Sequence, residues 1–325
     1  MTLKSLLTGL LCIGTLAAGA APAGAHGLAG KRFFPSTLAI DDPFVTDELS
    51  LPSIFHIKSP ARGDEPATRE TEISGEFSKR ITPNLGLSLE GELVSLEPDR
   101  GPGLGGFGNL EVGLKYQFFK SDLHETILSL GLGWEVGGTG RKAVEAESFD
   151  GVKPALFFGK GFGDLPDALS FLKPFAVTGV VEANIPTRSR TKTVTITFDE
   201  DTGEFEAETE IERHPNVFHW GFAIEYSIPY LQSFVKDVGL PAPFNRMIAV
   251  VELSFENPLD RGQAGKSTGT VNPGIIWAGR YFQIGVEAVF PINERTGKNV
   301  GVRALLHFFL DDLFPRSLGR PLLGK

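Results

Sequence analysis

The chain has 325 residues, 41% of them hydrophobic, with 31 Lys and Arg against 40 Asp and Glu and a net charge of −9. Its 39 glycines, 22 prolines and many aromatic residues, among them 26 Phe, favour short strands separated by turns, and therefore an all-β fold. The acidic balance excludes the basic surface that nucleic acid requires, and the single cysteine excludes disulfides and thiolate metal centres.

The first 25 residues predict a secretory signal peptide. An apolar run from Leu6 to Ala18 follows one Lys, and Ala23-Gly24-Ala25 forms an A-x-A cleavage site. Cleavage there removes Cys12, so the exported chain has no thiol. Residues 26–48 are predicted to form either a plug inside a barrel or a disordered periplasmic leader, because the segment is polar and contains proline.

From residue 48 onward, apolar residues alternate with polar and charged ones at a period of two, which predicts strands with two different faces. Gly103, Gly105 and Gly108 match G-x-G-x-x-G, but a strand follows them where a nucleotide site needs a helix, so we predict a loop. Twelve strands are predicted, over residues 48–58, 70–81, 84–96, 107–119, 123–136, 152–163, 174–185, 215–228, 246–256, 270–278, 281–291 and 299–310.

The connections between these strands alternate between short and long. This alternation is typical of outer-membrane barrels, which have short periplasmic turns and longer external loops. Only two helical-looking links, 164–173 and 229–245, depart from it. An even strand number then places both termini in the periplasm, and the hairpin from Lys192 to Glu212 extends outside. A soluble β-sandwich would also alternate, but long strands with aromatic residues near their ends favour a single transmembrane barrel over residues 49–310.

If the apolar faces contact lipid, the opposite faces line the lumen. Most of the charged residues on those faces are acidic, which favours a pore for cations or neutral solutes. The alternative is a lumen that ion pairs and shared protons pack shut. The predicted lumen-lining residues are Glu72, Glu76, Arg80, Glu90, Glu92, Glu111, Lys115, Glu125, Glu135, Glu182, Glu225, Glu252, Glu287 and Arg303, with Glu256 and Lys160 on the same faces.

No motif predicts catalysis, a cofactor or a metal. The stretch DRGQAGKSTG has two residues between Gly262 and Gly265 where a P-loop requires four. The six histidines lack the i, i+4 or short-loop spacing of metal sites. His124 is predicted to face lipid, as in outer-membrane phospholipases, but it lies beside a periplasmic turn with no serine nearby on its face. We therefore predict that the protein is not an enzyme.

The stretches GFGNLEVGLKYQFF (106–119) and VNPGIIWAGRYFQIGVEAVFPIN (271–293), with the closing strand, resemble a family of outer-membrane barrels associated with the meta-pathway of phenol degradation. The resemblance implies a transporter-like channel that passes small organic molecules, and it supplies no catalytic residues. The chain departs from the usual barrel ending. Phe308 and Phe309 are followed by LDDLFPRSLGRPLLGK, so residues 311–325 are predicted to form a periplasmic tail.

The sequence thus predicts a passive channel for small cations or small neutral or aromatic organic molecules in the outer membrane of a Gram-negative cell, with lipid and solutes as its partners. The alternative is a non-conducting structural or partner-binding barrel that acts through the acidic hairpin 192–212. The solute and the oligomeric state stay open.

Overall fold

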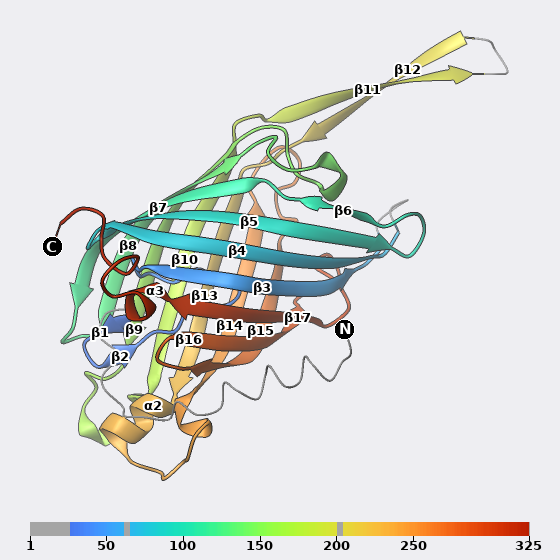
Figure 1. Cartoon of the computed structure of the whole chain (residues 1–325). Helices are drawn as coiled ribbons and strands as arrows, with labels where there is room; N and C mark the ends of the chain where they lie inside the picture. The colour runs from blue at the N-terminus through green and yellow to red at the C-terminus, as the bar shows by residue number, and fades with distance from the viewer. Residues whose placement is uncertain (1–26, 62–65, 200–203, 325) are drawn as a thin grey trace, which may run out of the picture.

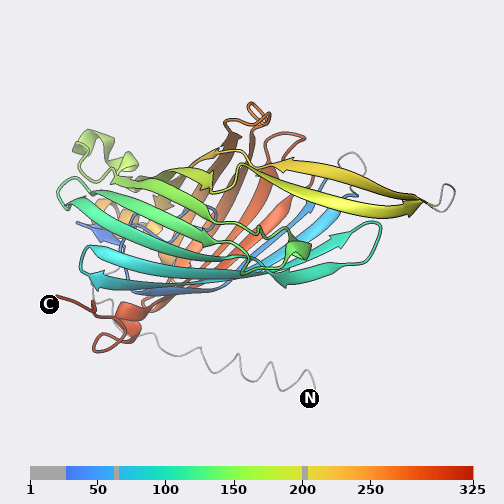
Figure 2. The same ribbon diagram turned by 90° about the horizontal axis from the view of Figure 1, so that it is seen from above.

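The computed structural model describes residues 27–61, 66–199 and 204–324. The predicted signal peptide lies outside these residues. The described chain forms a closed antiparallel barrel of twelve strands, as predicted (Figures 1 and 2). They are β3 (Glu48–Ser59), β4 (Thr68–Thr82), β5 (Leu85–Pro98), β7 (Leu110–Ser121), β8 (Thr126–Val136), β9 (Gly151–Gly161), β10 (Phe175–Pro186), β13 (Val217–Ser227), β14 (Met247–Pro258), β15 (Thr268–Ala278), β16 (Phe282–Pro291) and β17 (Gly301–Phe309).

The barrel closes between its first and last strands. β17 pairs with β3 from Val302 opposite His56 to Phe309 opposite Glu48. Every other pair joins strands that follow one another around the barrel, and β6 (Leu104–Phe107) adds a short strand to the edge of β5. Closure leaves no long unpaired edge among the described barrel strands; a strand in lipid could not tolerate such an edge, because nothing there can hydrogen-bond its backbone.

The two ends of the barrel differ. One end, which we call the turn end, carries the tight turn after β4, the turn at 122–125, and short helical links. These are η3 (Asp167–Leu172), α2 (Ile228–Tyr230), η4 (Leu231–Val235) and η5 (Phe244–Arg246). The other, the loop end, carries the longer connections, including η2 (Lys142–Val144). The long hairpin of β11 (Arg190–Asp199) and β12 (Glu204–Arg213) projects there (Figure 1).

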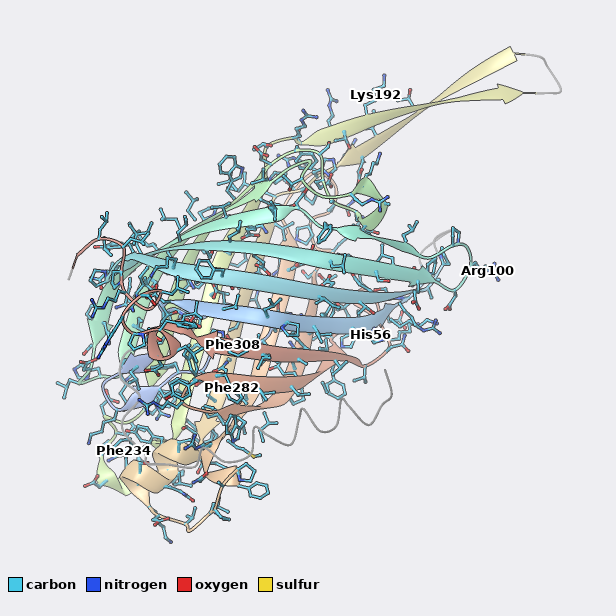
Figure 3. The ribbon with its side chains drawn as sticks, viewed as in Figure 1. His56, Arg100, Lys192, Phe234, Phe282 and Phe308 are labelled. Carbon is cyan, nitrogen blue, oxygen red and sulfur yellow. The ribbon has the colours of Figure 1, made fainter. Side chains whose placement is uncertain are left out.

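The outer surface of the barrel is apolar. Leu114 is 42% exposed, Leu130 52% and Ile284 46%, each on the face predicted to meet lipid. Aromatic side chains lie toward the turn end, where Phe282 and Phe308 sit with ring centroids 6.4 Å apart (Figure 3). Such an apolar belt with aromatic residues near its edge is what a transmembrane barrel presents to a bilayer. No helix in the described residues is long and apolar enough to cross a membrane.

The carboxyl-terminal tail starts with α3 (Leu310–Leu313) and lies at the turn end. It is held against β4: the Lys79 ammonium donates to the carbonyls of Leu318 and Arg320, at 2.8 and 2.6 Å. The Leu323 amide donates in turn to the carbonyl of Ile81 at 2.7 Å. The tail therefore packs on the strand ends through backbone and cation contacts, without extending β17.

Candidate functional site

Residues 27–47, which we call the inner segment, lie inside the barrel at its turn-end half. The segment begins with a small hairpin, β1 (Leu28–Ala29) and β2 (Arg32–Phe33), and then runs as irregular chain to β3. Its apolar residues are buried against inward-facing residues of the wall. Leu38 and Ile40 join a cluster with Phe157, Val180 and Val250, among others. Part of the interior beside the inner segment is therefore apolar, although the sequence alternation predicted a polar inner face throughout.

Glu252 holds the middle of the inner segment. Its side chain is fully buried, and its two carboxylate oxygens accept the backbone N–H groups of Leu38, Ala39 and Ile40 at 2.7, 2.8 and 3.0 Å. A carboxylate with several N–H donors is a strong, charge-assisted arrangement. From β17, the Arg303 guanidinium donates to the carbonyl of Leu38 at 3.1 Å. These two predicted lumen residues therefore bind the segment.

Arg32 anchors the start of the inner segment to the turn end. The guanidinium is fully buried, 3.4 Å from a carboxylate oxygen of Glu125 and 3.8 Å above the ring of Tyr230. It also donates to the backbone carbonyls of Lys173 and Pro174. The strand predicted from residue 123 begins at Thr126, so Glu125 lies in the turn before β8, with a φ of 44° and its carboxylate against Arg32.

The end of the inner segment is held by a second ion-pair group. Asp47 is fully buried and accepts from Lys79 at 2.7 Å and from the Arg80 guanidinium at 2.9 Å. Arg80 also donates to the carbonyl of Gly319 in the tail at 3.0 Å. The predicted lumen residue Arg80 thus connects the inner segment, the barrel wall and the carboxyl-terminal tail at the turn end.

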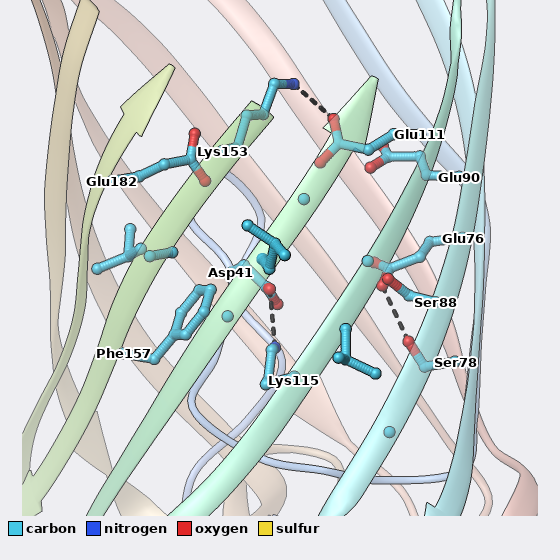
Figure 4. Close-up of a pocket in the computed structure, with 18 of the residues that line it drawn as sticks. Asp41, Glu76, Ser78, Ser88, Glu90, Glu111, Lys115, Lys153, Phe157 and Glu182 are labelled. Atoms are coloured by element: carbon cyan, nitrogen blue, oxygen red, sulfur yellow. Dashed lines mark hydrogen bonds and ion pairs between the residues drawn. The ribbon is translucent and has the colours of Figure 1, made fainter. Parts of the chain in front are cut away.

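An acidic cavity of about 210 Å³ lies between the inner segment and the wall (Figure 4). Glu90 is exposed within the barrel, and Glu76, Glu111 and Glu182 are partly buried. Two lysines form ion pairs with these acidic groups. Lys115 contacts Asp41 at 2.7 Å, and Lys153 contacts Glu111 at 2.5 Å (Figure 4). A second cavity of about 230 Å³ shares Asp41, Glu76 and Glu90 and reaches Arg303 and His307 on the other side of the segment.

Lys153 lines the acidic cavity, and the sequence did not reveal it as a candidate. It faces inward with Ala155 and Phe157 on β9, and it also lies 3.6 Å from Glu135. The inward residues that follow it are apolar because they pack on the inner segment, so the two faces of β9 could not be told apart by polarity. Lys160, predicted on the inner face, instead pairs with Asp164 at the turn end at 2.9 Å.

Of the remaining predicted residues, Glu225 and Glu287 are almost completely buried, at 1% exposure, and Glu225 accepts from the Thr178 hydroxyl at 3.3 Å. Glu72 and Glu92 are partly buried on β4 and β5, while Glu256 is exposed and contacts Thr268 at 3.4 Å. The predicted residues therefore do not form one group. Some hold the inner segment, some surround the acidic cavity, and others, such as Glu256, do neither.

Within the inner segment, burial raises the pKa of Asp42 to about 6, although the nearby Lys115 ammonium opposes this rise. Lys115 also donates to the Asp42 backbone carbonyl at 2.7 Å, and the Asp42 carboxylate accepts from the Phe44 amide at 2.8 Å. Asp42 therefore gains a proton more readily inside the barrel than it would in water.

No family model matches the chain, and no curated protein matches its sequence. Among solved structures, the KdgM porin is 12% identical over 80% of this chain and 98% of its own, with a TM-score of 0.43. The TodX deltaS2S3 mutant monoaromatic hydrocarbon channel is 10% identical over 84% and 91%, with a TM-score of 0.43. The translocator domain of autotransporter NalP from Neisseria meningitidis is 7% identical over 82% of this chain and 90% of its own, with a TM-score of 0.44. The resemblance to the meta-pathway family stays a prediction.

Proposed function

We propose that this chain is an outer-membrane channel for small solutes, namely cations or small neutral or aromatic organic molecules. The acidic cavity inside the closed barrel carries this proposal. Five carboxyl groups surround it, those of Asp41, Glu76, Glu90, Glu111 and Glu182, against two ammonium groups. An excess of negative charge in a narrow passage with low-dielectric walls concentrates cations and repels anions.

The outer membrane is the proposed location because the barrel presents an apolar belt and has an even number of strands. The predicted signal peptide supports export. We place the turn end, with the inner segment and the carboxyl-terminal tail, in the periplasm, and the loop end with the β11–β12 hairpin outside. This orientation follows from the difference in connection length between the two ends.

The inner segment is the proposed constriction of the channel. It fills the turn-end half of the interior and leaves cavities on two sides, so a solute that crosses the barrel must pass along it. Small solutes would use the polar space beside Asp41, while larger ones would require the segment to move.

Planar-bilayer recording of the folded protein under a potassium chloride gradient tests the proposal. We expect discrete conductance steps with a reversal potential that shows cation preference. Glu90→Gln combined with Glu92→Gln should reduce that preference, whereas Glu97→Gln, on the exposed end of the same strand, should leave it unchanged. Replacing residues 36–45 by Gly and Ser, with Arg32 and Asp47 kept as anchors, should increase conductance. Silence from both the native protein and this variant would contradict a channel.

The packing of the inner segment also favours a second function, a non-conducting barrel that binds a partner through the hairpin 192–212. Most side chains of that hairpin lie outside the described residues. Removing residues 192–212 would abolish partner binding if this second function holds, and would leave conductance intact if the channel proposal holds. Cell-surface capture of partners by the native and shortened proteins, compared with their conductance, separates the two.

A further inference from the structure

A cluster of three potential metal ligands lies at the loop end, away from the acidic cavity. Glu147 comes from the loop between β8 and β9, Glu212 from β12, and His214 from the chain just after β12. Each offers one ligand atom, and these atoms all lie within 4.8 Å of one another. His214 is only 7% exposed, and its ring packs on Phe149 with centroids 4.5 Å apart. The imidazole is therefore fixed in place by the fold.

One ring nitrogen of His214 contacts Thr191 and the other faces Glu147. The Thr191 hydroxyl lies 2.9 Å from His214 Nε2 and 3.5 Å from a carboxylate oxygen of Glu212. In the tautomer that carries its proton on Nε2, the imidazole donates to the Thr191 oxygen and Nδ1 has a lone pair.

That lone pair faces a carboxylate. His214 Nδ1 lies 3.2 Å from Oε1 of Glu147, an atom that also carries only lone pairs. In this tautomer a metal ion between the two atoms would be bound by both, whereas a proton on Nδ1 would join them by a hydrogen bond instead. The spacing suits an ion, because a nitrogen and an oxygen that are each about 2.0 to 2.2 Å from one Zn²⁺ lie little more than 3 Å apart.

We propose that Glu147, Glu212 and His214 bind a divalent transition-metal ion such as Zn²⁺ at the loop end. One imidazole and two carboxylates form a ligand set that such ions accept. The contacts that would orient the ligand are present: Thr191 holds the second ring nitrogen, and the Arg261 guanidinium donates to the His214 carbonyl. An adjoining cavity of about 180 Å³, which Glu135 and Asn184 also line, leaves room for water to complete the coordination.

The bound ion would fasten the base of the β11–β12 hairpin to the β8–β9 loop, two segments that are distant in sequence. Basic side chains limit its affinity. Lys142, Arg188, Arg190 and Lys192 line a neighbouring cavity together with Glu147 and Glu212, and their charge opposes that of the ion. The site therefore fits an ion that the protein takes up reversibly from the medium.

Calorimetric titration of ZnCl₂ into the chelator-treated, folded protein in detergent micelles tests the proposal. We expect one site per chain, with affinity weakened at least tenfold by His214→Gln and by Glu147→Gln. His124→Gln is the matched control, since His124 pairs with Asp164 at the opposite end of the barrel and is mostly exposed. Circular dichroism shows whether each variant is folded. If His214→Gln does not fold, Glu147→Gln still tests the proposal.

Two results would overturn the proposal. The first is a titration in which the native protein takes up no Zn²⁺, which would mean that a proton on Nδ1 pairs His214 with Glu147. The second is an affinity that is unchanged in folded Glu147→Gln or that falls equally in His124→Gln, which would place the ion elsewhere on the chain.

Discussion

Glu252 shows how a single buried carboxylate can position a whole segment. The side chain lies on the inner face of β14, and its three backbone N–H donors come from consecutive residues of the inner segment. Because each donor would lose its partner if the carboxylate were changed, and a hydrogen bond to a charged group contributes about 1.5 to 3 kcal/mol, the docked position of residues 38–40 depends on this one residue.

Replacing Glu252 by Gln should therefore loosen the inner segment. The neutral amide loses the charge and turns a donor toward backbone N–H groups, so we expect amide exchange at residues 38–40 to accelerate by roughly tenfold or more, in line with the energy of a charge-assisted bond. Hydrogen–deuterium exchange of the peptide that covers 36–42 measures it. Glu256→Gln, four residues further along the same face and exposed, is the control. Equal exchange in the two variants would show that Glu252 does not hold the segment.

At the scale of the element, each strand has one face for lipid and one for the interior. The position along the strand determines how far a charge on the lipid face would lower the free energy of unfolding. Leu114 lies mid-strand on β7, 42% exposed, while Leu123 is 78% exposed in the turn that follows the same strand. The first is expected at the depth of the hydrocarbon core and the second at the membrane surface.

An arginine at position 114 should consequently destabilise the barrel, while the same residue at 123 should be tolerated. We expect Leu114→Arg to lower the free energy of unfolding by about 2 to 4 kcal/mol and Leu123→Arg by about 0 to 1 kcal/mol, the depth dependence of charges on the lipid face of barrels. Urea unfolding in lipid vesicles measures both. A cost that is the same at the two positions would be inconsistent with a membrane boundary between them.

At the scale of the whole molecule, the two barrel ends define an orientation that can be tested directly. The only cysteine, Cys12, lies in the predicted signal peptide, so single cysteines can be introduced into an exported chain without thiols. Ala264 is exposed in a long connection at the loop end, and Ala168 is exposed in η3 at the turn end. The two positions offer matched substitutions on opposite sides of the proposed membrane.

In intact cells, a membrane-impermeant maleimide should label Ala264→Cys and should reach Ala168→Cys only after the outer membrane is permeabilised, because the bilayer and the closed barrel separate the two ends. Fluorescent labelling of the purified protein after each treatment gives the result. The reverse pattern would show that the orientation is the opposite of the proposed one. Equal labelling of both positions in intact cells would show that the outer membrane does not separate the two ends of the barrel.

The sequence by itself determined the number of strands, their two faces and the difference between the barrel ends. Period-two alternation and turn residues are local properties of the chain, so twelve segments from Glu48 to Phe309 could be predicted without tertiary information. Only the tertiary structure decided that β17 closes on β3, that residues 27–47 occupy the interior, that Lys153 faces the acidic cavity and Lys160 does not, and that Glu147 meets His214. Contacts across a lumen depend on the register and tilt of strands that are far apart in sequence, and alternation along one strand carries no information about them.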